Sequence, residues 1–197
     1  MEIISNALFW ISNGLLVPVV VLLLLFLLRA LILAGGFFGE YYRRSKLQGR
    51  ISGMLEEDST LLSSAIEALP ADTKSHQAKA AKQLAAHSDD RAWCERLLAN
   101  YEVEAEQELG HSRTLAKLGP MLGLMGTLIP MGPALVGLAA GDLASMAYNM
   151  QVAFATTVVG MLIAAIGVVT LQVKQRWYAR ELNDLEYIAE KLKDEKK

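Results

Sequence analysis

Cysteine and histidine are scarce in this chain, and their scarcity excludes two kinds of site. The 197 residues include one cysteine, Cys94, so no disulfide framework can form within the chain. The three histidines, His76, His87 and His111, are scattered and form no paired ligand motif with each other or with the cysteine. We therefore expect no metal site, no redox site and no cofactor.

Charged residues are absent from two long apolar stretches. Residues 118–140 and 152–173 contain no Asp, Glu, Lys or Arg, and each can cross a bilayer, which takes about 20 residues as a helix. A third apolar stretch covers residues 15–33. The residues before it include Glu2 but no Lys or Arg, and no A-x-A-like site follows it, which favours a retained anchor over a signal peptide. The sequence predicts an all-α integral membrane protein with three transmembrane helices.

The polar residues also lack the groupings that two further classes of protein need. No nucleophile, base and orienting group can be assembled from them, so we expect no enzyme. Internal repeats and a charged residue at mid-membrane are missing as well, which argues against a small-molecule transporter.

Basic residues flank three ends of the predicted spans. They are Arg43, Arg44, Lys46 and Arg50 after the first span, Arg113 and Lys117 before the second, and Lys174, Arg176 and Arg180 after the third. The positive-inside rule places these three ends in the cytoplasm. The connection between the second and third spans, expected at about residues 141–150, has Asp142 and no basic residue, so we expect it outside. The predicted topology has the N-terminus outside and the C-terminus in the cytoplasm, with Arg29 reaching the headgroups from the inner boundary of the first span.

Four segments follow from this topology. Residues 1–40 form the first transmembrane helix, 41–114 a cytoplasmic helical segment, 115–173 the second and third spans, and 174–197 a cytoplasmic C-terminal helix. An amphipathic pattern predicts a helix over residues 47–69, which Pro70 ends, and a further helix restarts near residues 88–90. That helix meets no proline before Pro120, so we expect it to run into the second span. The alternating glutamates Glu102, Glu104, Glu106 and Glu108 are interpreted as a solvated face, because residues two apart point to different sides of a helix.

Small and hydroxyl-bearing residues recur in the second and third spans. The motif GLMGT at residues 123–127 ends in Thr127, and the third span carries the adjacent pair Thr156 and Thr157. The residues that we expect to pack helices closely are Gly119, Gly123, Gly126, Gly160, Ala164 and Gly167. One interpretation is a tight helix interface whose threonines bond their own backbone carbonyls. The other is a hydroxyl-lined conduit, whose titrating acid must come from a partner because these spans have none.

The same residues carry a resemblance to a known family. GLMGT, followed by AFATTVVGMLIAAIG at residues 153–167, resembles the paired signature of the MotA/TolQ/ExbB proton channel family, over roughly residues 115–174. The three-span plan is more similar to the TolQ and ExbB branch than to four-span MotA. ExbB-like members usually carry a glutamate a little over one turn before the third-span threonine, where this chain has Val152 beside Gln151.

The resemblance implies a function and its partners. The chain would form a ring, a pentamer, in the inner membrane around single-span partner helices similar to ExbD, TolR or MotB, which carry a membrane aspartate. The ring would act as an ion channel or motor subunit, in which proton flow drives mechanical work or energised transport. The pore-lining residues would be Thr127 and Thr157, with Thr156 as an adjacent candidate. The alternative is a structural oligomeric scaffold without ion conduction, and under either reading we expect the lipid bilayer, and no nucleic acid, as a partner.

Overall fold

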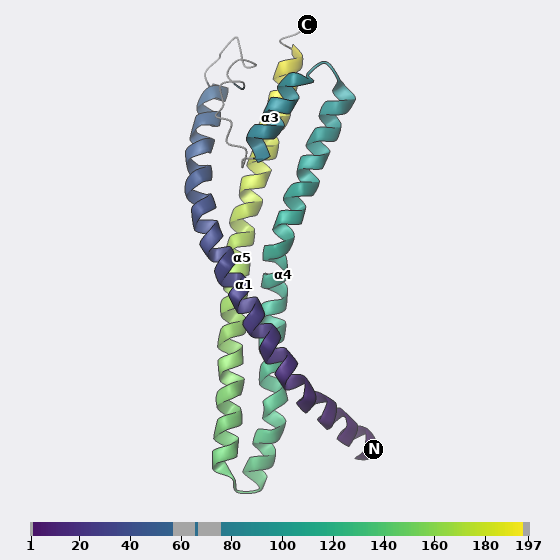
Figure 1. Ribbon diagram of the computed structural model, residues 1–197, viewed down its shortest axis with the longest axis vertical. Helices are drawn as coiled ribbons and strands as arrows, with labels where there is room; N and C mark the ends of the chain where they lie inside the picture. The colour runs from purple at the N-terminus through teal and green to yellow at the C-terminus, as the bar shows by residue number, and fades with distance from the viewer. Residues whose placement is uncertain (1, 57–65, 67–75, 195–197) are drawn as a thin grey trace. The chain divides into compact units, whose positions relative to one another are not determined.

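The computed structural model of the chain describes residues 2–56, 66 and 76–194, and its regular elements are all helices (Figure 1). Helix α1 is Glu2–Glu56, α3 is His76–Ala86, α4 is Arg91–Ala139 and α5 is Leu143–Asp194. Three helical stretches are long and apolar enough to cross a membrane, namely Asn6–Tyr42, Arg91–Ala139 and Leu143–Lys193. The predicted all-α class with three membrane-spanning helices is confirmed. Most of the helix predicted over residues 47–69 lies outside the described residues; its first part, to Glu56, continues α1 without a break.

The chain divides into two compact units, and the three long helices contribute to both. One unit comprises Met1–Phe37 and His111–Leu171, and we call it the membrane unit. The other comprises Phe38–Gly110 and Gln172–Lys197, and we call it the polar unit.

Two aspartates begin the long helices. Asp90 precedes α4, and its carboxylate accepts a hydrogen bond from the backbone N–H of Trp93 at 3.1 Å. Asp142 precedes α5 and accepts in the same way from the N–H of Ser145 at 3.0 Å. Both bonds satisfy a backbone donor that the first turn of a helix otherwise leaves unpaired.

The turn between α4 and α5 is much shorter than the connection expected at residues 141–150. Gly141 has a φ of +76°, a conformation that costs glycine little, and the N–H of Asp142 donates to the carbonyl of Gly137 at 2.8 Å. These two features end α4 and let Asp142 begin α5 at once. The expectation of a longer loop was wrong, because residues 143–150 form the first turns of α5.

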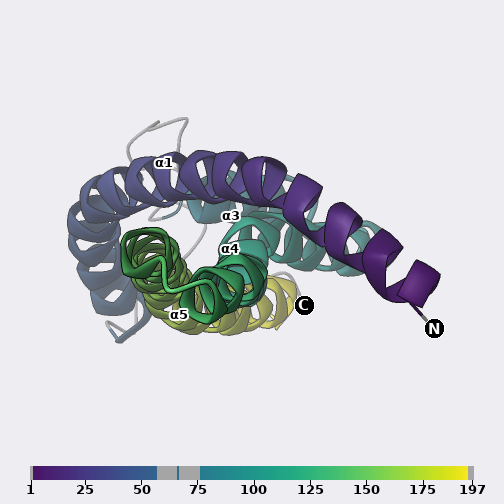
Figure 2. The same cartoon turned by 90° about the horizontal axis from the view of Figure 1, so that it is seen from below.

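In the membrane unit, α4 and α5 run side by side as a hairpin, and α1 lies across them (Figures 1 and 2). Leu23 and Ala30 of α1 form a buried cluster with Leu115 of α4 and Ile163 of α5. Many large apolar side chains on α1 are exposed, as expected for a helix that faces lipid.

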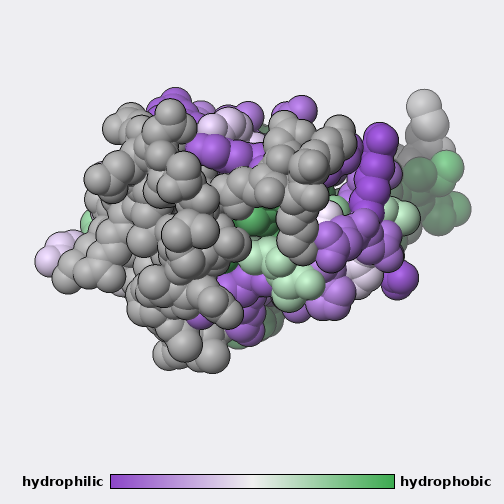
Figure 3. Space-filling view, turned by 90° about the horizontal axis from the view of Figure 1, so that it is seen from above, coloured by the Kyte–Doolittle hydropathy of each residue, from purple (hydrophilic) through white to green (hydrophobic). Residues whose placement is uncertain are grey.

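The polar unit is built from α3 and the ends of the three long helices. Its buried side chains include Leu84 of α3, Tyr101 of α4, and Leu185 and Ile188 of α5. Hydrophilic side chains cover most of the described surface seen in Figure 3. This contrast with the membrane unit follows the change from apolar to mixed sequence along each long helix.

Candidate functional site

The α4 and α5 backbones approach each other closely along a line of small residues in the membrane unit, which we call the seam. Its members are Gly119, Gly123 and Gly126 of α4 and Ala153, Thr156, Gly160, Ala164 and Gly167 of α5. A Cβ atom built on Gly160 would lie 2.7 Å from the carbonyl oxygen of Gly119 and 2.7 Å from the Cα atom of Gly123. One built on Gly119 would lie 2.9 Å from the backbone nitrogen of Ala164. Only glycine fits at these two positions without separating the helices.

Thr156 belongs to this seam. Its side chain is 6% exposed, and a Cβ atom built on Gly126 would lie 2.6 Å from the Cβ atom of Thr156. Its hydroxyl lies within hydrogen-bond distance of the carbonyl oxygens of Val152, at 3.1 Å, and Ala153, at 2.9 Å. The side chain therefore fills the space that Gly126 leaves between the two helices.

Thr127 and Thr157 differ from Thr156 in burial. Both side chains are half-buried, so each keeps one side open beyond its own hairpin. The hydroxyl of Thr127 donates to the carbonyl of Leu124 at 2.7 Å, and that of Thr157 donates to Ala153 at 3.1 Å. A hydroxyl has one donor and two acceptor lone pairs, so both oxygens can still accept a hydrogen bond from outside the chain. Their chemistry suits water or a neutral carboxylic acid better than a carboxylate.

The helix stretches around these threonines carry no acidic, basic or histidine side chain. Residues 118–139 of α4 and 143–173 of α5 contain no Asp, Glu, Lys, Arg or His. The described part of the chain also has no group of three or more His, Cys, Asp or Glu side chains that could hold a metal ion. These two stretches therefore offer hydroxyls and no carboxylate or imidazole.

A second hydroxyl pair was not found from the sequence. Ser112 and Thr170 are both buried. The hydroxyl of Thr170 donates to the Ile166 carbonyl at 2.7 Å, and its oxygen lies within hydrogen-bond distance of the Ser112 hydroxyl oxygen, at 3.2 Å. The spacing of the sequence indicated this position. Thr170 lies three residues from Gly167, as Thr157 lies three residues from Gly160, and residues three apart share a helix face. The bond links α4 to α5 at one end of the seam.

Arg44 is the centre of an ion-pair network in the polar unit. Its guanidinium donates to Glu181 at 2.6 Å, to Glu40 at 2.9 Å and to the hydroxyl of Tyr178 at 3.1 Å. The same guanidinium lies 5.4 Å from the ring centroid of Trp177. Burial lowers the pKa of this guanidinium, but Glu181, Tyr178 and Glu40 together outweigh that effect, so the pKa is raised and Arg44 stays charged.

Two tyrosines complete the network. Tyr101 of α4 donates its hydroxyl to Glu181, and Tyr178 of α5 donates to Glu108. Burial raises the pKa of the Glu181 carboxyl, and Arg44 and Tyr101 oppose that rise. The Glu108 side chain is 40% exposed, so it belongs to a solvated face as interpreted, and its carboxylate also accepts a hydrogen bond from another helix.

His76 and Lys174 extend the same network. His76 of α3 lies 3.3 Å from a carboxylate oxygen of Glu104, and Lys174 lies 3.1 Å from one of Glu40. The contacts fix four helix segments to one another. They join partners far apart in sequence, such as Arg44 and Glu181, which are 137 positions apart.

Comparison with known proteins identifies one family. The MotA/TolQ/ExbB proton channel family matches residues 58–187 of this chain. No curated protein matches the chain. The matched residues include both glycine-rich faces of the seam and all three candidate threonines.

Proposed function

Since the chain belongs to the MotA/TolQ/ExbB proton channel family, we propose that it is the ring-forming subunit of a proton-driven motor. The observation that carries the proposal is the contrast between Thr156, sealed in the seam, and the half-buried Thr127 and Thr157. The seam makes α4 and α5 one rigid hairpin. Copies of that hairpin, arranged in a ring, would present Thr127 and Thr157 to a central lumen.

The acid would come from a single-span partner similar to ExbD, TolR or MotB, whose helix carries an aspartate in the membrane. The hydroxyls of Thr127 and Thr157 already donate within their own helices, so toward the lumen they act as acceptors. They favour water and the protonated aspartic acid over the carboxylate. Protonation thus lets the aspartate pass an apolar sector of the ring, where its ionised form is strongly disfavoured. The membrane potential supplies about 2.3 kcal/mol per charge for each 100 mV.

The basic flanks support an orientation with the N-terminus outside and the polar unit in the cytoplasm, in the inner membrane. The three-span plan supports the TolQ and ExbB branch, with a pentameric ring. In this plan the outer helix is residues 1–40 and the cytoplasmic segment is residues 41–114. The channel core is residues 115–173, and the cytoplasmic tail is residues 174–197. In this arrangement Thr156 holds the hairpin together and does not line the pore.

Proton flux into liposomes tests the proposal, with the chain reconstituted beside a single-span helix that carries one aspartate. Thr127→Val and Thr157→Val are expected to reduce flux strongly, because valine keeps the shape of threonine and removes the acceptor. Thr156→Val is the matched control, since the same change one residue away alters the seam and leaves the lumen intact. Native mass spectrometry of each variant should give the same ring.

The second candidate function is a structural scaffold without ion conduction. It is favoured by one observation, that all three threonine hydroxyls donate within their own helix. No flux from the wild type beside the aspartate helix would select the scaffold, whereas equal flux from the wild type, Thr127→Val and Thr157→Val would remove the two hydroxyls from the ion pathway.

A further inference from the structure

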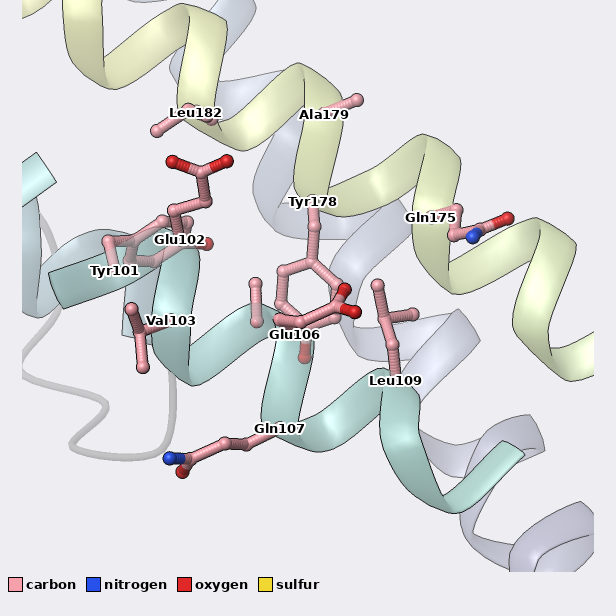
Figure 4. A pocket seen from close by; sticks show the side chains of 11 residues that line it. Tyr101, Glu102, Val103, Glu106, Gln107, Leu109, Gln175, Tyr178, Ala179 and Leu182 are labelled. Atoms are coloured by element: carbon pink, nitrogen blue, oxygen red, sulfur yellow. The ribbon is translucent and has the colours of Figure 1, made fainter. Parts of the chain in front are cut away.

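An open groove of about 550 Å³ lies between α4 and α5 in the polar unit (Figure 4). Its walls are mainly apolar and include Ala105 and Leu109 of α4 and Leu182 of α5. Its volume is within the range of sites that bury a ligand or a few side chains.

The floor of the groove presents aromatic rings. Tyr101 is 5% exposed and Tyr178 is 6% exposed. Their hydroxyls donate to Glu181 and Glu108, so the small part of each ring that stays exposed is apolar. Such a floor favours apolar side chains.

The rim of the groove is acidic. Glu102 is exposed, and Figure 4 shows its carboxylate pointing toward α5 near Leu182. The Glu106 carboxylate lies beside the Tyr178 ring, whereas Val103 and Gln107 point away from α5. The residues that line the groove include these two glutamates and no Lys, Arg or His. An occupant that places Lys or Arg beside Glu102 is therefore complementary in charge.

We propose that this groove binds a basic, amphipathic segment of the single-span partner, the flank that adjoins its membrane helix on the cytoplasmic side. The inference rests on the proposed function, which supplies that partner and places the polar unit in the cytoplasm. Single-span proteins carry Lys and Arg on their cytoplasmic flank, so the flank has the charge that the rim selects. Apolar side chains between these basic residues would cover the rings of Tyr101 and Tyr178.

Peptide binding to the full chain in nanodiscs of phosphatidylcholine tests the inference. The probe is a short fluorescein-labelled helical peptide with leucine on one face and lysine at the edges of that face. Uncharged lipid keeps the peptide from binding the bilayer by charge alone. Fluorescence anisotropy is expected to report binding to the chain and none to empty nanodiscs, and the same peptide with glutamate in place of lysine is expected not to bind.

Two variants test the groove itself, and each has a matched control. Ala179→Trp fills the groove and Glu102→Lys reverses the charge of the rim, and each is expected to weaken binding by about tenfold or more. Ala99→Trp and Glu186→Lys make the same changes at exposed residues outside the lining, and both should bind the peptide within about twofold of the wild type.

Three results would overturn the inference. They are undiminished binding by Ala179→Trp, binding of the glutamate peptide as tight as that of the lysine peptide, and no binding above that of empty nanodiscs. A disulfide between two chains bearing Ala179→Cys, made in a Cys94→Ala background, would also overturn it by assigning the groove to a second copy. Peptide binding without partner-dependent proton flux would contradict the proposed function and leave the groove as a site for basic peptides.

Discussion

Replacing Gly160 by alanine is expected to destabilise the membrane unit by about 2 kcal/mol. The new Cβ atom would meet backbone on every near side, with the Gly119 oxygen and the Gly123 Cα atom at 2.7 Å and the Gly123 nitrogen at 3.0 Å. Ordinary contact begins near 3.4 Å, so the helices must separate by roughly 0.7 Å at this point. No side chain can rotate away to relieve the contact.

Titration of SDS into dodecylmaltoside micelles, followed by far-UV circular dichroism, measures the loss. Gly160→Ala should unfold at a lower mole fraction of SDS than the wild type. Gly35→Ala is the control on α1, because nothing lies within 4 Å of a Cβ atom at Gly35. Alanine favours a helix over glycine by roughly 0.5–1 kcal/mol, so this control should be equal to the wild type or slightly more stable.

A further variant separates backbone contact from side-chain contact. In Gly126→Ala, the three heavy atoms nearest the new Cβ atom all belong to the side chain of Thr156. Adding Thr156→Gly removes these atoms and should restore part of the lost stability. No glycine substitution on the facing helix can rescue Gly160→Ala. If Gly160→Ala unfolds together with the wild type and with Gly35→Ala, the close approach of α4 and α5 is refuted.

Two predictions concern the buried polar contacts. Arg44→Met should cost about 3 kcal/mol, because it leaves the Glu181 carboxylate, whose side chain is 9% exposed, without its cation; an unchanged SDS midpoint would contradict this. In the same variant Glu181 loses Arg44, the charge that most strongly opposes the rise of its pKa by burial. The folded state therefore binds more protons than the unfolded state when the pH is above the ordinary carboxyl pKa of 4.5. Its stability should fall more steeply than that of the wild type as the pH rises above 4.5, and parallel pH profiles would argue against it. Ser112→Ala should cost only about 1 kcal/mol in the SDS titration, because Thr170 keeps its bond to Ile166, and a loss as large as that of Arg44→Met would count against this bond pattern.

The long helices could be predicted because their signals are local. Asp90 precedes a proline-free pattern that leads into an apolar stretch, and α4 begins directly after it. The turn after α4 was predicted too long, although Gly141 and Asp142 contain its signal, because the absence of charge in residues 143–150 does not separate a loop from the first turns of a helix. Boundaries of this kind depend on single hydrogen bonds.

The seam and the network differ in how far the sequence could predict them. Glycines at three- and four-residue steps indicate a face for close packing, and the contacts of Gly119 with Gly160 lie on such a face. The sequence could not separate Thr156 from Thr157, because the rotation of a helix against its partner decides which of two neighbours is buried. Arg44 and Glu181 are 137 positions apart, and no local pattern indicates such a pair.

The most direct test of the central claim compares three reconstitutions of this chain in liposomes under a proton gradient and a membrane potential. The chain is reconstituted alone, with a single-span helix that carries one membrane aspartate, and with the same helix carrying asparagine instead. We expect rapid proton flux only with the aspartate helix, because residues 118–140 and 143–173 supply hydroxyls and no acid. Equal proton flux from the chain alone, or with the asparagine helix, would contradict it.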